Sequence, residues 1–341
     1  MSGSPPGQDA FAEHLRLKIE AYHEAALIYA AVKLGLPGRM AARARVTDQL
    51  ALELGLSASH LIRFLRGLCS LGICEELSGG KFALTQAGRS LCSGSASHLA
   101  EKVEIVVEQY WQPWANLVST LKTGKPAFEQ VFGMPVSDWR SRNEEQGALF
   151  DSHLAKETLA QAEPIIEALD VSRARTVADI GDSYGGLIAA ILRAHPHLAG
   201  ILFDQPHIIE MAKPFLQLLG VAERVKLVGG DFLAEIPVHA DLYILKGVLQ
   251  QWDDAEARAI LLNCRKAMPD GANLVIIERL LPERATDDPA AIMLDLHMMT
   301  ITGGRARSLE QFAALLSEAG LAPSQVTPTS SGLTIINGTH S

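Results

Sequence analysis

The second half of the chain predicts a doubly wound α/β fold, in which helices cover both faces of a mostly parallel sheet. Two observations predict it. From residue 175 onward apolar strands alternate with helical segments, and the expected strands are 176–180, 200–204, 225–229, 241–246, 273–278 and 333–337. The first strand runs into the glycine turn at Gly181, and about twenty residues later the second strand ends at Asp204. A glycine turn between strand and helix, followed by such an acid, is typical of nucleoside binding.

The first part of the chain, residues 11–100, predicts a helical region that contains a winged helix. Residues 11–36 read as one helix whose apolar positions extend around most of its surface, which favours burial against a second copy of the chain. Residues 46–90 predict a winged helix-turn-helix, with helices from Thr47 to Glu53 and from Ala58 to Leu71, and Ser57 as the cap of the second. A small hairpin follows, over 72–84.

Residues 101–165 predict a helical linker, and residues 166–341 a ligand-binding domain. The linker is rich in aromatic residues, namely Tyr110, Trp111, Trp114, Phe128, Phe132 and Trp139. Aromatic residues at this spacing are compatible with a packed core and equally with a lid over a substrate.

Composition narrows the function classes. The 341 residues carry a net charge of −9, which argues against nucleic acid as a main partner despite Arg63 and Arg66 on the second helix of the winged segment. No apolar run reaches the length of about 18 residues that spans a membrane, and the amino-terminal residues lack a signal-peptide pattern. The four cysteines form no CxxC pair and the histidines no metal motif. We therefore expect a cytoplasmic protein with reduced cysteines, no metal and a small-molecule ligand.

Charged side chains gather at one edge of the expected sheet. Asp179, Asp204, Asp231, Lys246 and Glu278 all lie at or just beyond the carboxyl ends of strands. Ligands of open α/β sheets bind at that edge. The sequence therefore places the ligand site there.

Several motifs carry a resemblance to a known family. They are Thr123-Gly-Lys-Pro-Ala-Phe-Glu-Gln-Val-Phe-Gly-Met134, Leu202-Phe-Asp-Gln-Pro206, Val228-Gly-Gly-Asp-Phe232, Asn263-Cys-Arg-Lys-Ala-Met268 and Thr302-Gly-Gly-Arg305. The chain resembles, over nearly its whole length, the S-adenosylmethionine-dependent small-molecule O-methyltransferases, which include plant caffeate and flavonoid enzymes and bacterial antibiotic-pathway enzymes. The resemblance implies a Rossmann-like class I methyltransferase domain with an N-terminal helical winged-helix dimerisation domain, and hence a homodimer.

The resemblance also implies a cofactor site for S-adenosyl-L-methionine. Asp179 and Gly181 would hold its methionine part, and Asp204, followed by Gln205, would accept hydrogen bonds from the ribose hydroxyls. Asp231 would receive the adenine amino group, Phe232 would cover the ring, and Lys246 would position the cofactor from its far side.

Two departures from the family concern the chemistry. Where the family has three glycines in a row, Gly181 is followed by Asp182-Ser183-Tyr184. Where the family has a catalytic histidine followed by an acid, the run Leu245-Lys-Gly-Val-Leu-Gln250-Gln251-Trp252 has two glutamines. Of the two glutamates that orient that histidine in the plant enzymes, Glu278 is kept and the other is Ala306.

A glutamine amide does not take up a proton. The missing histidine therefore favours a methyl acceptor that has no proton to lose. A thioether sulfur satisfies this, as in the methylthio-hydroxybutyrate S-methyltransferase branch that leads to dimethylsulfoniopropionate. Gln250 and Gln251 would then hydrogen-bond the substrate beside Glu278, and its cavity would be lined by Tyr110, Trp111, His153 and Met298.

Two alternatives remain open. His297, or His153 on the helix that closes over the cofactor, would act as a substitute base, and O-methylation would result. The other alternative is a non-methylating enzyme of the hydroxylase or pericyclase type, which uses the bound sulfonium as a positive charge.

Overall fold

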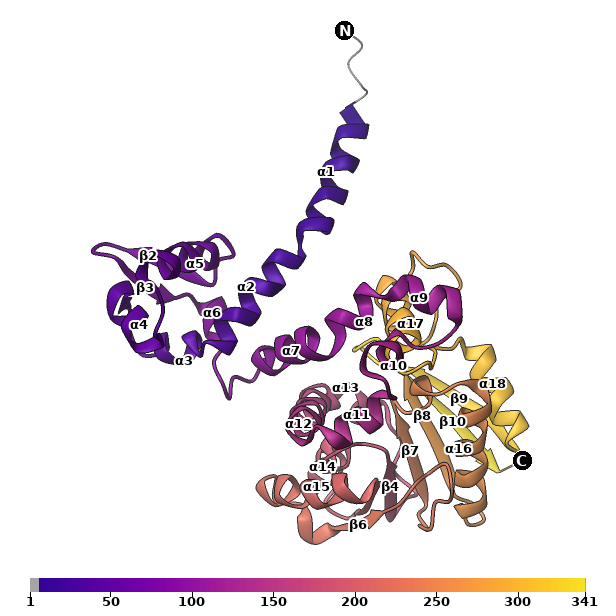
Figure 1. The fold of residues 1–341 in the computed structure, drawn as a ribbon. Coiled ribbons are helices and arrows are strands. Elements are labelled where there is room, and N and C mark those ends of the chain that lie inside the picture. Colours follow the sequence, from indigo (N-terminus) through magenta and orange to yellow (C-terminus); the bar gives the residue numbers. More distant parts are fainter. Residues whose placement is uncertain (1–5, 341) are drawn as a thin grey trace. The chain divides into compact units, whose positions relative to one another are not determined.

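The computed structural model describes residues 6–340, and the side chains of residues 11–339, as two compact units (Figure 1). The first unit ends at Trp111 and the second begins at Gln112. The boundary therefore lies inside the predicted helical linker.

The first unit consists of helices and a small antiparallel sheet in the order β1-β3-β2. Its elements are α1 (Pro6–Glu20), α2 (Tyr22–Lys33), α3 (Leu36–Met40), β1 (Arg45–Val46), α4 (Thr47–Leu54), α5 (Ala58–Ser70), β2 (Cys74–Leu77), β3 (Lys81–Leu84), α6 (Gln86–Arg89), α7 (Leu99–Ile105) and a π-helical turn, η1 (Val106–Tyr110). The two helices and the hairpin predicted over 46–90 are present as α4, α5 and β2–β3. The core between them contains Leu50, Leu61, Leu65 and Phe82.

Two expectations for this unit were wrong in detail. The single helix predicted over 11–36 is divided into α1 and α2 by a break at Ala21, and a third helix starts at Leu36 after a left-handed Gly35. Ser57 is the N-cap residue of α5, as predicted, but its hydroxyl makes no capping hydrogen bond and lies 2.9 Å from that of Ser59. On α5, Arg66 pairs with Glu76 of the hairpin, so this cation is neutralised within the unit.

The second unit is built on a seven-stranded sheet in the order β6-β5-β4-β7-β8-β10-β9. The strands are β4 (Thr176–Ile180), β5 (Ala199–Asp204), β6 (Val225–Gly229), β7 (Leu242–Lys246), β8 (Asn273–Glu278), β9 (Leu321–Pro328) and β10 (Thr334–His340). The first five are parallel, whereas β10 is antiparallel to both β8 and β9. The doubly wound prediction is confirmed, and β9 is a strand that it omitted.

Both faces of this sheet are covered by helices (Figure 1). Period-two alternation directs Ala178 and Tyr243 to one face, against α16 (Asp254–Ala267) and α18 (Leu309–Glu318), and Val177 and Leu242 to the other. The second face packs against α12 (Glu144–Ala160), α13 (Ala162–Ala168), α14 (Gly186–Ala194) and α15 (Pro206–Leu218). Burial on both sides explains why the strands are almost wholly apolar.

The remaining elements surround the carboxyl edge of the sheet or connect its strands. They are α8 (Trp111–Ala115), α9 (Leu117–Thr123), α10 (Ala127–Phe132), α11 (Val136–Arg142), α17 (Pro289–Ile301) and the 3₁₀ turns η2 (Ala222–Arg224) and η3 (Leu249–Gln251). Phe128, Phe132 and Trp139 pack on one another, with ring centroids 4.5 to 5.7 Å apart. These three aromatic residues therefore form a local core.

No helix in the described part of the chain is long and apolar enough to cross a membrane. Over the same residues, no group of histidine, cysteine, aspartate and glutamate side chains is arranged to hold a metal ion. All four cysteines are free thiols.

Candidate cofactor and substrate site

The glycine turn after β4 forms the floor of the site. Gly181 has φ of 81°, and a Cβ built on it would lie 2.9 Å from Cγ2 of Val248 and 3.5 Å from Cε1 of Phe232. Only glycine fits this backbone and this spacing. The turn therefore lies directly against the segment after β7 and against the phenyl ring predicted to cover adenine.

Two buried carboxyl groups lie side by side at this turn. Asp179 is wholly buried at the end of β4, and the carboxylate of Asp182 accepts hydrogen bonds from the backbone N–H groups of Leu187, at 2.7 Å, and of Ile188. Burial and the neighbouring carboxyl of Asp182 raise the pKa of Asp179 well above its ordinary range. Burial also raises the pKa of Asp182.

Asp204 ends β5 as predicted and connects to two further residues of the loop. Its Oδ2 accepts the N–H of Ser183 at 3.0 Å and its Oδ1 the N–H of Gln205 at 2.7 Å, while the Ser183 hydroxyl donates to Asp151 of α12 over 3.3 Å. Ser183 has φ of 51°, in the region that favours glycine. Burial raises the pKa of Asp204 to about 7 and that of Asp151 to about 6. Asp151 was not predicted, because nothing in its local sequence marks it.

The other predicted cofactor residues occupy the same edge. The ammonium of Lys246, at the end of β7, donates to the hydroxyl of Thr158 on α12 over 3.0 Å. Asp231 is exposed beyond β6 and accepts the N–H of Leu233 at 2.9 Å. Phe232 is edge-on to Trp252, with ring centroids 5.8 Å apart. The carboxyl ends of β4 to β7 thus bring the predicted set together.

The segment with the two glutamines is fixed through its backbone. Glu278 is buried, and its Oε1 accepts the N–H of Gln250 at 3.0 Å. The Gln251 amide donates to the carbonyl of Gly247 at 3.0 Å. Burial raises the pKa of Glu278 to about 7, and its other oxygen accepts no hydrogen bond from the described residues.

The Thr302-Gly-Gly-Arg305 motif holds this segment from the other side. A Cβ on Gly304 would lie 2.3 Å from the carbonyl oxygen of Gln250, so any side chain there would displace the segment. Gly303 has φ of 85° and lies against Pro126. Both glycines of the motif are therefore required: Gly303 for its backbone conformation and Gly304 for its close contact with the Gln250 segment.

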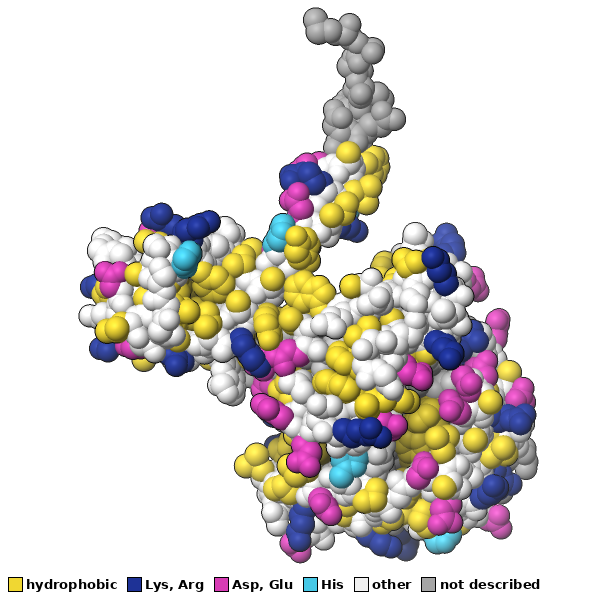
Figure 2. Space-filling model, in the orientation of Figure 1, with side chains coloured by type: hydrophobic (Ala, Val, Ile, Leu, Met, Phe, Trp, Pro, Cys, Tyr) yellow, Lys and Arg dark blue, Asp and Glu magenta, His cyan; other side chains and the backbone are white. Residues whose placement is uncertain are grey.

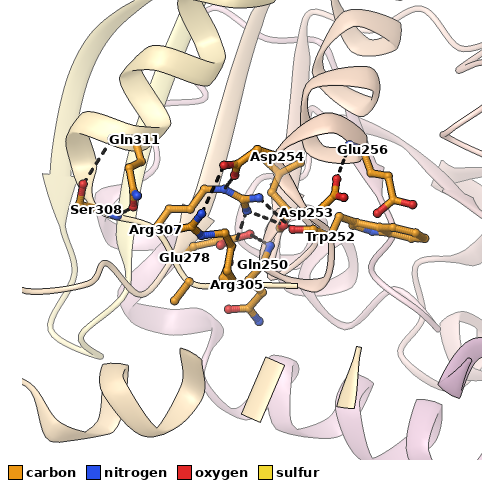
Figure 3. Close-up of polar contacts among 12 residues, drawn as sticks. Gln250, Trp252, Asp253, Asp254, Glu256, Glu278, Arg305, Arg307, Ser308 and Gln311 are labelled. Atoms are coloured by element: carbon orange, nitrogen blue, oxygen red, sulfur yellow. Dashed lines mark hydrogen bonds and ion pairs between the residues drawn. The ribbon is translucent and has the colours of Figure 1, made fainter. Parts of the chain in front are cut away.

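Arg307 completes the support and was not predicted (Figure 3). It is wholly buried, and its guanidinium donates to the carbonyls of Leu249 at 2.7 Å and of Trp252 at 2.8 Å. Its Nε pairs with Asp254 at 2.9 Å. One side chain thus binds both ends of the turn that carries Gln250 and Gln251.

His297 on α17 contacts Trp114 of α8. The indole N–H donates to Nδ1 of His297 over 3.2 Å, and the two rings are stacked with centroids 6.2 Å apart. Indole is a donor only, so Nδ1 is the acceptor and the neutral imidazole has its proton on Nε2. Met298, next to it, is buried.

The remaining predicted residues are placed differently. His153 is buried on α12, with its Nε2 3.6 Å from the Glu157 carboxylate one turn away. Tyr110 and Trp111 belong to the first unit, at the end of η1 and the start of α8. Their part in a substrate cavity remains a prediction.

A family model described as the O-methyltransferase domain matches residues 114–322. The chain belongs to the O-methyltransferase family. It is 37% identical over 319 residues to the phenazine O-methyltransferase PhzM of Lysobacter antibioticus, with 93% of each chain covered. It is 31% identical to the 8-amino-8-demethylriboflavin N,N-dimethyltransferase of Streptomyces davaonensis, covering 86% of this chain and 85% of that one.

Solved structures agree with this membership. LaPhzM superposes with a TM-score of 0.92 at 36% identity, covering 97% of this chain and 99% of that one. NcsB1 of neocarzinostatin biosynthesis, solved with S-adenosylmethionine and 2-hydroxy-5-methyl naphthoic acid, superposes with a TM-score of 0.80 at 27% identity, covering 93% of this chain and 96% of that one. The protein is an S-adenosylmethionine-dependent methyltransferase that acts on small molecules.

The residues present fit this cofactor. S-adenosylmethionine carries a sulfonium, an ammonium and two ribose hydroxyls. The buried carboxyls of Asp179 and Asp182 suit its positive charges, and the carboxyl of Asp204 at a strand end suits the hydroxyls. Gly181 lets the turn pack directly against Val248 and Phe232, which brings these two side chains to the same edge of the sheet.

Proposed function

We propose that this methyltransferase acts on a planar aromatic or heteroaromatic molecule, at a nitrogen or oxygen that needs no proton removed by the enzyme. The proposal rests on one observation: neither residue 250 nor His297, the two side chains considered as a base, is able to take a proton from the substrate. Position 250 is glutamine, and the Nδ1 lone pair of His297 already accepts the indole N–H of Trp114. An amide and an N–H donor are both unable to take a proton.

The acceptor class follows from nucleophilicity. A ring or aryl nitrogen has a lone pair and requires no prior ionisation, and an acidic phenol is ionised before it binds. One of the relatives above is named as an O-methyltransferase of phenazine and another as an N,N-dimethyltransferase of a riboflavin derivative. Both names refer to fused, planar ring systems, and the stacked Trp114–His297 pair supplies a flat surface of matching shape.

The thioether acceptor favoured by the sequence gains no support from these relatives, whose names specify oxygen and nitrogen. A nitrogen acceptor, like a thioether sulfur, can be methylated without an enzyme base, so the glutamine at position 250 is compatible with either atom. We therefore replace the thioether with an aromatic nitrogen or pre-ionised oxygen as the preferred acceptor.

Catalysis then rests on alignment. The cofactor supplies a methyl group already activated on sulfonium, so the protein has to hold the acceptor in line with it. Arg307, Glu278 and Gly304 fix the backbone of the Gln250 segment, which leaves the Gln250 amide as a hydrogen-bonding group for the acceptor, whereas the Gln251 amide donates to Gly247.

For the cofactor we propose that Asp204 accepts the ribose hydroxyls, Asp231 the adenine amino group, and Phe232 packs on the adenine ring. Gln205 lies next to Asp204 at the start of α15, on the ribose side. Lys246 is held by Thr158 and balances the charge of Asp179 and Asp182.

We also propose a homodimer formed through α1. Phe11, Leu15 and Ile19 are 75%, 59% and 73% exposed on this helix (Figure 2). A continuous apolar face of this kind in a chain of the family indicates a surface that a second copy covers.

The test is release of S-adenosylhomocysteine with four acceptors offered separately: a phenazine carboxylate, an arylamine, an unionised catechol and a methylthio-hydroxy acid. We expect turnover with the phenazine or the arylamine and little with the catechol below its pKa. Turnover with the catechol alone at neutral pH contradicts the proposal, because it requires a base. Cofactor binding without release from any acceptor favours the non-methylating alternative.

A further inference from the structure

The acid in the glycine loop occupies the amino terminus of a helix. The carboxylate of Asp182 accepts the N–H groups of Leu187 and Ile188, which lie in the first turn of the nine-residue helix α14. The residue that precedes the helix is Gly185, with φ of 84° and no side chain to cap it. Asp182 therefore acts as the cap from three residues earlier in the loop.

Such a terminus is otherwise a binding site for an anion from the ligand. Unpaired N–H groups and the helix dipole both favour negative charge there, and glycine loops use this to bind anionic groups. The amino-acid end of S-adenosylmethionine carries one anion, its carboxylate, and one cation, its ammonium. With Asp182 in place, the carboxylate of the ligand meets a site that is already filled and negative.

A second observation indicates a cationic ligand group next to it. Asp179 is wholly buried, and neither of its oxygens accepts a hydrogen bond from the described residues. The neighbouring carboxyls of Asp182 and Asp204 repel its charge, and Lys246, which attracts it, has its ammonium bound to Thr158. Burial and the adjacent Asp182 carboxyl therefore favour the protonated form of Asp179, and a cation bound beside the two carboxyls favours ionisation of both.

We propose that Asp182 replaces the ligand carboxylate at the amino terminus of α14, so that the site recognises the amino-acid end of the cofactor by its ammonium, through Asp179 and Asp182. The inference rests on the assignment of this loop to the cofactor. It makes Asp182 a specificity-determining residue. Removing the ligand carboxylate then has little effect on affinity, whereas removing the ammonium removes the charge-assisted contact between the ligand and the two carboxyls.

The experiment is calorimetric titration of the full chain at pH 8 with three ligands: S-adenosylhomocysteine, its decarboxylated analogue and its deaminated analogue. We expect the decarboxylated analogue to bind within about threefold of S-adenosylhomocysteine. The deaminated analogue should bind at least ~30-fold more weakly, since a charge-assisted contact is lost.

The variants Asp182→Gly and Asp182→Asn distinguish two effects of the Asp182 side chain: its capping of the amino terminus of α14 and its negative charge. Asp182→Gly opens the helix terminus, so the decarboxylated analogue should now bind about tenfold more weakly than S-adenosylhomocysteine. Asp182→Asn keeps a capping oxygen, so the decarboxylated analogue should still bind well while the ammonium contributes less. Asp170→Asn, at an exposed acid before β4, is the matched control and should leave all three affinities unchanged.

The outcomes are distinct. A wild-type protein that loses more than tenfold in affinity without the ligand carboxylate overturns the role of Asp182, although the cofactor site stands. A wild-type protein that binds neither S-adenosylmethionine nor S-adenosylhomocysteine overturns the site itself. The two analogues decide the matter on the wild type alone if a variant fails to fold.

Discussion

The indole N–H of Trp114 donates to Nδ1 of His297 over 3.2 Å, and this contact decides the role of the histidine. It leaves Nε2 as an N–H donor, because a neutral imidazole has one proton. His297 was a candidate for the missing base, and a neutral imidazole with its proton on Nε2 and its Nδ1 lone pair bound by the indole does not fit that role.

We therefore expect His297→Gln to retain kcat/KM within a few-fold, since the glutamine oxygen can accept the indole N–H of Trp114 in place of Nδ1. His297→Phe should lose about 10- to 100-fold, because it leaves the half-buried indole N–H of Trp114 without its acceptor. Steady-state kinetics on both variants is the measurement. An equal loss of ~10²–10⁴-fold in both variants would show that His297 removes a proton after all.

Arg307 should be a stability determinant of the site. Arg307→Met removes two hydrogen bonds to buried carbonyls and the partner of Asp254, and we expect a loss of roughly 2–4 kcal/mol in the free energy of unfolding. Denaturant unfolding measures it. Asp254→Asn is the control, because it keeps a side-chain oxygen for Nε of Arg307 and leaves both carbonyl contacts of the guanidinium in place. Similar losses in both variants would contradict the proposed role of the carbonyl contacts.

The sequence predicted the sheet well and the support of the site poorly, for physical reasons. Strands with both faces buried are continuous apolar runs, so five parallel strands were found within a residue or two. The strand β9 carries Ser324, Gln325 and Thr327 on an exposed edge and has no such run. The acids at strand ends followed from topology. Arg307 and Asp151, in contrast, act through tertiary contacts with segments far away in the chain, which local sequence does not reveal.

Cofactor binding should depend on pH through Asp204. Burial raises the pKa of this carboxyl to about 7 in the free protein, and the ionised form is the better acceptor for ribose hydroxyls. Below that value a proton has to leave on binding, so affinity should rise with pH, by up to about tenfold per unit, and level off above pH 7 to 8. Calorimetry from pH 5.5 to 8.5 measures it.

The matched variant Asp204→Ala should bind S-adenosylhomocysteine more weakly by roughly 2–4 kcal/mol and show a weaker pH dependence than the wild type. An unchanged affinity would refute the assignment of Asp204 to the cofactor.

The exposed face of α1 should hold two copies together. Replacing Phe11 and Ile19 by lysine places charge on that face, and light scattering should show a change from dimer to monomer. Lysine at Leu218, an exposed leucine of the second unit, is the control and should leave the dimer intact. A wild-type monomer at micromolar concentration excludes the dimer.

Gln250→His tests the absence of a base most directly. Glu278 holds the backbone N–H of residue 250 with one oxygen, and its second oxygen, buried and without a hydrogen bond from the described residues, is available to orient an imidazole. With an unionised phenol as acceptor, the variant should gain about 10-fold or more in kcat, because a positioned imidazole removes the proton. With a ring-nitrogen acceptor no proton leaves, so the rate should not rise. A gain with the nitrogen acceptor would mean that Gln250 limits alignment rather than proton transfer, and Gln250→Asn, which shortens the side chain without adding a base, distinguishes the two effects.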